Sequence, residues 1–211
     1  QWQDDAPVAA LVFYRALMQA GDVAPIDRLI DALRAKGMNP LPLFGASLKE
    51  TETAAIIADF LVRADVDVIL NMTSFAVSDP SKMAGAALGD DQDVMRSVGP
   101  FGAVDAPVFQ LVLASNQQAD WQTSTAGLTA RDLAMNVALP ELDGRILTRA
   151  IGFKQPLTKD PATHAMTTSY VASDDRAAFV ADLVGRWCRL RHLPNDVKKI
   201  GFVLANYPNK D

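Results

Sequence analysis

Two carboxylates stand two residues apart in the segment Pro140-Glu141-Leu142-Asp143-Gly144. In an extended segment this spacing directs both side chains to the same side of the chain. Such a pair can hold a divalent cation, or accept the protons that a ligand loses when a metal enters it. A simpler interpretation stays open, in which Asp143-Gly144 is a turn and Glu141 is an exposed loop acid.

Polar residues also follow three predicted strands, at Tyr14-Arg15, Asn71-Met72-Thr73-Ser74 and Asn206-Tyr207. In a doubly wound sheet, the loops after parallel strands meet at one edge, which is where such folds bind ligands. The planar guanidinium of Arg15 suits bidentate binding of a carboxylate, although a surface loop arginine is an equally good interpretation.

The remaining candidates are a histidine and a tryptophan. His164 has no second His or Cys at metal-ligand spacing, which excludes a structural zinc site and leaves the role of a transient metal ligand. Trp121 lies in a polar run, which predicts an exposed ring on which a flat ligand could stack. His192 ends a basic helix and Cys188 follows a tryptophan on it, so we expect a solvated histidine and a buried or half-buried thiol.

Several function classes are disfavoured by composition and by motifs that the sequence lacks. The net charge is −5 with mixed signs, so no basic stripe is present for nucleic acid. The longest apolar runs have the length of strands, so no membrane span is expected, and a single cysteine favours a reducing cytoplasm. The chain has no dinucleotide glycine motif, no Walker motif and no nucleophile elbow.

The elements that must position these residues are those of an α/β fold. Apolar runs at 8–13, 41–44 and 66–70 predict buried strands. Gly21-Asp22 and a capping box at 47–50 predict that a helix begins after each of the first two strands. The order β-α-β-α-β implies a parallel sheet with right-handed crossovers.

The second half continues this pattern less regularly. Residues 78–105 predict an irregular excursion, and the other expected elements are a strand at 107–113, a helix from Thr129 to Pro140, extended segments at 146–153 and 167–171, a long helix after Ser173, and a strand at 200–204. We therefore predict a mostly parallel, doubly wound sheet flanked by helices over residues 1–198. Residues 199–211 would begin a second α/β lobe, and the chain would be a piece of a longer polypeptide.

Three segments together carry a family resemblance: Val12-Phe13-Tyr14-Arg15, residues 136–145, and residues 205–211. In order and content they resemble the family of cobaltochelatase and magnesium-chelatase large subunits, and the cobaltochelatase branch is the better match. The similarity runs from about residue 7 to the last residue.

The resemblance implies insertion of Co²⁺, as a substrate, into a corrin precursor, hydrogenobyrinic acid a,c-diamide, during aerobic cobalamin synthesis. It also implies that AAA+-type partner subunits bind ATP and Mg²⁺ while this chain binds neither. Within that expectation Glu141 accepts a pyrrole proton, and Asp143 and His164 are candidate metal ligands. The expected contacts to the macrocycle are Arg15, Asn71, Trp121, Asn206 and Tyr207.

Two alternatives remain open. The first is the magnesium-chelatase branch with protoporphyrin as ligand, since oxygen ligands accept Mg²⁺ and Co²⁺ alike. The second is a non-catalytic module with two α/β lobes, as in solute-binding proteins. An isolated piece of a chelatase is expected to be inactive.

Overall fold

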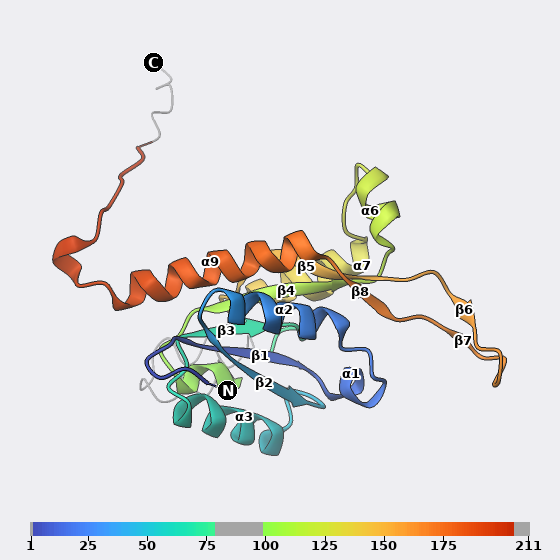
Figure 1. Ribbon diagram of the computed structural model, residues 1–211, viewed down its shortest axis with the longest axis horizontal. Helices are drawn as coiled ribbons and strands as arrows, with labels where there is room; N and C mark the ends of the chain where they lie inside the picture. Colours follow the sequence, from blue (N-terminus) through green and yellow to red (C-terminus); the bar gives the residue numbers. More distant parts are fainter. Residues whose placement is uncertain (1, 79–98, 205–211) are drawn as a thin grey trace.

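The computed structural model describes residues 2–78 and 99–204, which form a six-stranded sheet with helices on both faces (Figure 1). The strand order is β2-β1-β3-β4-β5-β8, in which the pairs from β2 to β5 are parallel and β8 is antiparallel to β5. The strands are β1 (Val8–Tyr14), β2 (Asn39–Gly45), β3 (Val68–Asn71), β4 (Val108–Ala114), β5 (Ile146–Lys154) and β8 (Tyr170–Ala172). The predicted α/β class and mostly parallel sheet are confirmed.

The helices bury the two faces of the sheet separately. On one face, α2 (Ala24–Ala35) and α9 (Asp174–His192) cover the side chains of Leu11, Leu70 and Phe109. On the other face, α3 (Thr51–Arg63) and the 3₁₀ helix η1 (Gly99–Ala103) cover Val12 and Ile69. The alternation along β1 places successive side chains in opposite layers, as strand geometry requires.

Shorter elements complete the fold. They are α1 (Arg15–Gln19), α6 (Gln118–Thr123), α7 (Ala130–Leu133), the π-helical turn η2 (Ala134–Ala138), α8 (Leu139–Glu141), the strands β6 (Thr158–Lys159) and β7 (Met166–Thr167), and η3 (Asn195–Val197). The hairpin β6–β7 follows β5 and precedes β8 in the sequence, and it extends away from the six-stranded sheet (Figure 1). Among the described residues, no helix is long and apolar enough to cross a membrane.

The strand order creates a topological switch between β1 and β3. From β1 the chain first moves to β2 on one side, and then returns to β3 on the other side. The connections on the two sides of this switch cross opposite faces of the sheet, which leaves a crevice beyond the carboxyl ends of β1 and β3. The crevice is the part of the fold in which ligand binding is expected.

The edge strand β2 contains two prolines, Pro40 and Pro42, which lie opposite Ala9 and Leu11 of β1. The Asn39 N–H donates to the Pro7 carbonyl beside β1. Since strand N–H groups alternate in direction, the proline nitrogens occupy positions on the open side of β2.

Several predicted boundaries are wrong by a few residues. The α3 helix begins at Thr51 rather than within the 47–50 capping box, and α2 begins at Ala24 rather than after Gly21-Asp22. Asp22 instead accepts a hydrogen bond from the Tyr170 N–H at 2.6 Å, which ties it to β8.

The last predicted strand is not formed. Residues 200–204 pair with no strand in the described part of the chain, and Phe202 and Val203 are 86% and 96% exposed. A strand at this position needs a neighbouring strand to satisfy its backbone groups, so the second lobe stays a prediction. Within the predicted 78–105 excursion, residues 79–98 lie outside the described residues, and 99–103 form η1.

Candidate functional site

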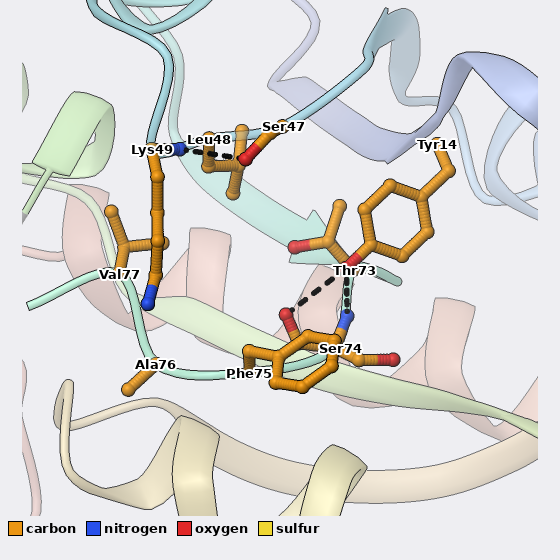
Figure 2. A pocket seen from close by; sticks show the side chains of 9 residues that line it. All are labelled: Tyr14, Ser47, Leu48, Lys49, Thr73, Ser74, Phe75, Ala76 and Val77. Atoms are coloured by element: carbon orange, nitrogen blue, oxygen red, sulfur yellow. Dashed lines mark hydrogen bonds between the residues drawn. The ribbon is translucent and has the colours of Figure 1, made fainter.

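A pocket of about 270 Å³ lies at the switch between β1 and β3 (Figure 2). We call it the switch-point pocket. Its walls come from the end of β1, the loop after β2 and the loop after β3, so the predicted meeting of Tyr14 with the 71–74 loop is confirmed. The lining residues are Tyr14, Ser47, Leu48, Lys49, Thr73, Ser74, Phe75, Ala76 and Val77.

Tyr14 holds the loop after β3 by its phenol group. The Tyr14 hydroxyl donates to the Ser74 carbonyl at 3.2 Å and accepts from the Ser74 N–H at 3.1 Å (Figure 2). The Ser74 hydroxyl donates to Asn136 Oδ1 at 2.6 Å. The two backbone groups of Ser74 would otherwise be unpaired at a strand end, so Tyr14 fixes the loop in one place.

Below this loop lies a buried amide pair. Asn71 Nδ2 donates to Gln110 Oε1 at 2.8 Å and to the Thr73 carbonyl at 3.0 Å, and Gln110 Nε2 donates to the same carbonyl at 3.0 Å. Asn71 is fully buried and Gln110 is 1% exposed. The predicted substrate contact at Asn71 therefore faces protein groups, and its amide supports the loop from inside.

Asp143 and Arg145 form a buried ion pair that continues this network. Arg145 Nη2 lies 2.6 Å from Asp143 Oδ2, both side chains are 1% exposed, and Arg145 Nη1 donates to Gln110 Oε1 at 3.2 Å. Burial lowers the pKa of the Arg145 guanidinium from its usual value, and the Asp143 carboxylate opposes that shift. The guanidinium also lies over the ring of Phe101, 5.5 Å from its centroid.

The Asp143 carboxylate joins this ion pair to the wall of the pocket. It accepts from the Val77 N–H at 2.8 Å, from the Ser78 N–H at 3.0 Å and from the Ser78 hydroxyl. With the Arg145 contact, four donors use the acceptor sites of one carboxylate. The role of metal ligand stays a prediction for Asp143, and it would require some of these donors to be released.

Glu141 lies beside this network but outside it. It ends the α8 helix, its side chain is exposed, and the turn 142–144 follows. The extended geometry predicted for the Glu141–Asp143 pair is wrong, because the chain stays helical through Pro140 and then turns. The two carboxylates therefore do not form a pair, although the Asp143–Val77 hydrogen bond keeps the Glu141 turn next to the pocket wall.

Phe75 is in a strained backbone conformation. Its φ angle is +68°, in the left-handed region that side chains other than glycine rarely adopt, and 44% of the residue is exposed. The Phe75 N–H donates to the Met135 carbonyl at 2.8 Å. Packing and hydrogen bonds thus hold an aromatic ring open to solvent at the pocket, at some cost in backbone energy.

The other predicted site residues are scattered. His164 lies in the exposed turn of the β6–β7 hairpin, with φ +58°. Trp121 is half-buried instead of exposed, because its ring packs on Phe153 at 5.3 Å and under the Arg176 guanidinium at 4.5 Å. Arg15 begins α1 and lines a second pocket next to Tyr14.

The remaining predictions concern Asn206, Tyr207, metal binding and Cys188. Asn206 and Tyr207 lie outside the described residues. In residues 2–78 and 99–204, no group of three or more His, Cys, Asp or Glu side chains is placed to hold a metal ion. Cys188 is buried as predicted, and burial raises the pKa of its thiol to about 11, with the Asp67 charge adding to the shift.

Sequence reasoning missed Lys49, Phe75, Gln110 and Arg145. A signal was available for Gln110, which interrupts the apolar strand 108–114, since a polar side chain inside such a strand needs a buried partner. No local signal marks Lys49 or Phe75, because their importance comes from the fold that brings three loops together.

Comparison with known proteins identifies the family to which this chain is similar. The sequence matches the family model described as CobN/Magnesium Chelatase over residues 1–211. It is 42% identical over 210 residues to the aerobic cobaltochelatase subunit CobN of Pseudomonas aeruginosa, covering 100% of this chain and 16% of that protein. It is 27% identical to the chloroplastic magnesium-chelatase subunit ChlH of Oryza sativa subsp. indica, covering 97% of this chain and 14% of that protein.

A solved structure agrees with these sequence matches. The catalytic subunit of cobaltochelatase from Mycobacterium tuberculosis superposes with a TM-score of 0.69 and 32% identity, covering 89% of this chain and 15% of the solved one. The present chain thus spans about one sixth of the length of the proteins that it matches.

Proposed function

Because this chain belongs to the CobN/magnesium chelatase family, we propose that the complete protein inserts Co²⁺ into a corrin precursor, hydrogenobyrinic acid a,c-diamide. The observation that carries the choice of metal and ring is the 42% identity to a cobaltochelatase subunit, against 27% to a magnesium-chelatase subunit. Insertion of Mg²⁺ into protoporphyrin is the second candidate, since the same family contains both activities.

The proposal divides the reaction between subunits. Metal insertion requires that the ion lose water, that the ring be distorted and that two N–H protons be accepted. We assign ATP and Mg²⁺ to AAA+-type partner subunits in a cytoplasmic complex, in keeping with the lack of a Walker motif in this sequence. Co²⁺ is a substrate of the reaction in this scheme.

Within the complete protein, this domain would supply one wall of the macrocycle site. The switch-point pocket and the exposed end of α8 are neighbours, because Asp143 binds the Val77 and Ser78 N–H groups from the turn that follows Glu141. The pocket provides apolar and aromatic surface, and Glu141 provides a solvent-accessible carboxylate beside it. We assign acceptance of a pyrrole proton to Glu141, with the rest of the protein closing the site over it.

The choice of macrocycle is tested by absorbance titration of the complete subunit. The corrin diamide should shift the absorbance spectrum at lower concentrations than protoporphyrin does. Tighter binding of protoporphyrin would favour the magnesium branch. A spectrum that changes with neither ring would contradict the proposal and favour a non-catalytic binding module.

The role of Glu141 is tested by Glu141→Gln in the same complete subunit, assayed with its partner subunits. Loss of a general base slows a reaction by roughly 10²–10⁴-fold, so insertion should slow by about that factor while macrocycle affinity stays unchanged. Glu52→Gln on α3 is the matched control, since Glu52 is an exposed carboxylate near the start of another helix. Insertion at the parent rate in Glu141→Gln would remove this residue from the mechanism.

A further inference from the structure

Tyr14 separates two pockets, each of which contains one basic side chain. The switch-point pocket contains Lys49. On the other side of Tyr14 lies a second pocket, also of about 270 Å³, lined by Arg15, by other residues of α1 and by Ala46. The two cavities therefore share one aromatic wall, Tyr14, at the carboxyl end of β1.

The position of Lys49 is fixed by its neighbours in the loop after β2. Leu48 is buried in the core layer between the sheet and α3, and the Ser47 hydroxyl accepts from the Lys49 N–H at 3.2 Å. With Leu48 anchored inward, the Lys49 side chain runs along the pocket wall opposite Tyr14 (Figure 2). Phe75 lines the same cavity between them.

Neither Lys49 nor Arg15 forms an ion pair with a residue in the described part of the chain. Three basic residues in or directly after α2 and α3 differ from them: Arg28 pairs with Asp174, Lys36 with Asp182 and Arg63 with Asp59. The carboxylate of Glu50, the residue after Lys49, accepts instead from the Thr53 hydroxyl at 2.9 Å. Two cations without an ion-pair partner among the described residues, beside two adjoining cavities, favour an anionic ligand.

We propose that the two pockets bind two carboxylate groups of one ligand, with Lys49 taking one carboxylate and Arg15 the other. Lys49 acts as a point charge, and the Arg15 guanidinium can bind its carboxylate bidentately. Tyr14 and Phe75 supply apolar surface between the two charges. The inference rests on the proposed function, since the corrin precursor is a ring with several carboxylates on its periphery. Lys49 and Arg15 would then recognise two of these peripheral carboxylates.

The test compares two ligands on the complete subunit by absorbance titration: the corrin diamide, and an analogue in which every carboxylate is converted to an amide. Lys49→Gln and Arg15→Gln should each weaken binding of the diamide by roughly 10-fold, and the double variant by about 100-fold, in the range for hydrogen bonds to charged groups. The variants should change affinity for the amidated analogue by less than about 2-fold, because that analogue carries no charge to be bound.

Two further variants separate charge recognition from structural effects. Lys49→Arg keeps the charge and should retain the diamide affinity within about 3-fold. Lys159→Gln, in the β6–β7 hairpin, removes another exposed lysine that does not line either pocket and should leave both affinities unchanged.

Three outcomes overturn the inference in distinguishable ways. If the parent protein binds the diamide and the Gln variants bind it equally well, the carboxylate assignment fails and the proposed function stands. The assignment also fails if the variants weaken both ligands equally, since the cations would then act through the fold. If the parent protein binds no macrocycle, the proposed function itself fails, and the assignment fails with it.

Discussion

Asp143 and Asp67 are two buried aspartates that stand just before strands of the same sheet, yet their surroundings differ. Asp143 receives four donors, and its counterion Arg145 is as deeply buried as the carboxylate. Asp67 accepts the Val8 N–H at 2.8 Å, and its other oxygen lies 2.5 Å from His192 Nε2. The His192 side chain is 61% exposed, so water can replace it.

The difference between the surroundings of Asp143 and Asp67 indicates which part of this domain is more rigid. The Asp143 carboxylate is held by four donors and connects to the backbone of the pocket wall, although Arg145 Nε, which is buried, has no hydrogen-bond partner among the described residues. The contact of Asp67 ties β1 to β3 at the opposite ends of these strands, away from the loops that line the switch-point pocket. A buried carboxylate with four donors is costly to expose or to leave without its counterion, whereas an ion pair that water can reach is less so.

The largest effect is expected from Asp143→Ala. Removal of one partner from a buried ion pair leaves an uncompensated charge and costs about 3–5 kcal/mol of unfolding free energy. Urea denaturation of the domain should show this loss. The double variant Asp143→Ala/Arg145→Met should recover part of it, because no buried charge remains. A loss below about 1 kcal/mol for the single variant would show that the network is open to water.

The second effect concerns pH and the thiol beside Asp67. The pKa of Cys188 is raised from 9.0 to about 11 in the folded state. Below pH 9 the thiol is protonated in both states. Between pH 9 and about 11 only the unfolded state ionises, so stability falls with rising pH, by roughly 2–3 kcal/mol in total.

Denaturation midpoints between pH 8 and 11 measure this effect for the parent chain and for Cys188→Ala. The parent should lose more stability over this range than the variant. Parallel curves would mean that the thiol is solvated in the folded state, and that the region near Asp67 is more open than the structure shows.

The third effect is expected from Asp67→Ala, the same substitution at the other buried aspartate. Asp67→Ala removes the acceptor of the Val8 N–H and should cost about 1–2 kcal/mol, the usual penalty for one unsatisfied buried donor. His192→Ala, measured in the same denaturation series, should cost less than Asp67→Ala because its side chain is largely exposed. If Asp67→Ala proved as damaging as Asp143→Ala, the contrast between the two aspartates would be lost.

The smallest effect is a gain in stability. Phe75→Gly removes the strain of a positive φ angle and should raise the unfolding free energy by up to about 1 kcal/mol, since 44% of the residue is exposed and the loss of ring packing offsets only part of the relieved strain. The same variant should bind the macrocycle less tightly if the ring contacts it. A stable variant with unchanged affinity would show that the strained residue serves the loop alone.

The sheet could be predicted from the sequence because buried parallel strands are continuous apolar runs, as at 8–13 and 66–70. The meeting of Tyr14 with the 71–74 loop followed from the same reasoning, since parallel strands end at one side. The geometry around Glu141 did not follow. Pro140 was expected to end the helix, but the wider π turn at 134–138 precedes it and accommodates a residue without an N–H group.

The role of Asp143 was also beyond local reasoning. Asp-Gly is a common turn pair, and the turn is indeed present, with Gly144 at φ +70°. Its carboxylate acquires its partners from Val77 and Ser78, which are more than sixty residues away in the sequence. The placement of Lys49 and Arg15 in two pockets that share Tyr14 likewise depends on the fold and could not be predicted from local sequence.

The two prolines of β2 have a consequence for assembly. An open strand normally offers a row of N–H donors on which another chain can build a further strand. Pro40 and Pro42 remove two such donors from the free side of this sheet. Growth of the sheet past β2, whether by a partner or by a second copy in an aggregate, is therefore disfavoured, which leaves β8, an edge strand without proline, as the side of the sheet where another strand could pair.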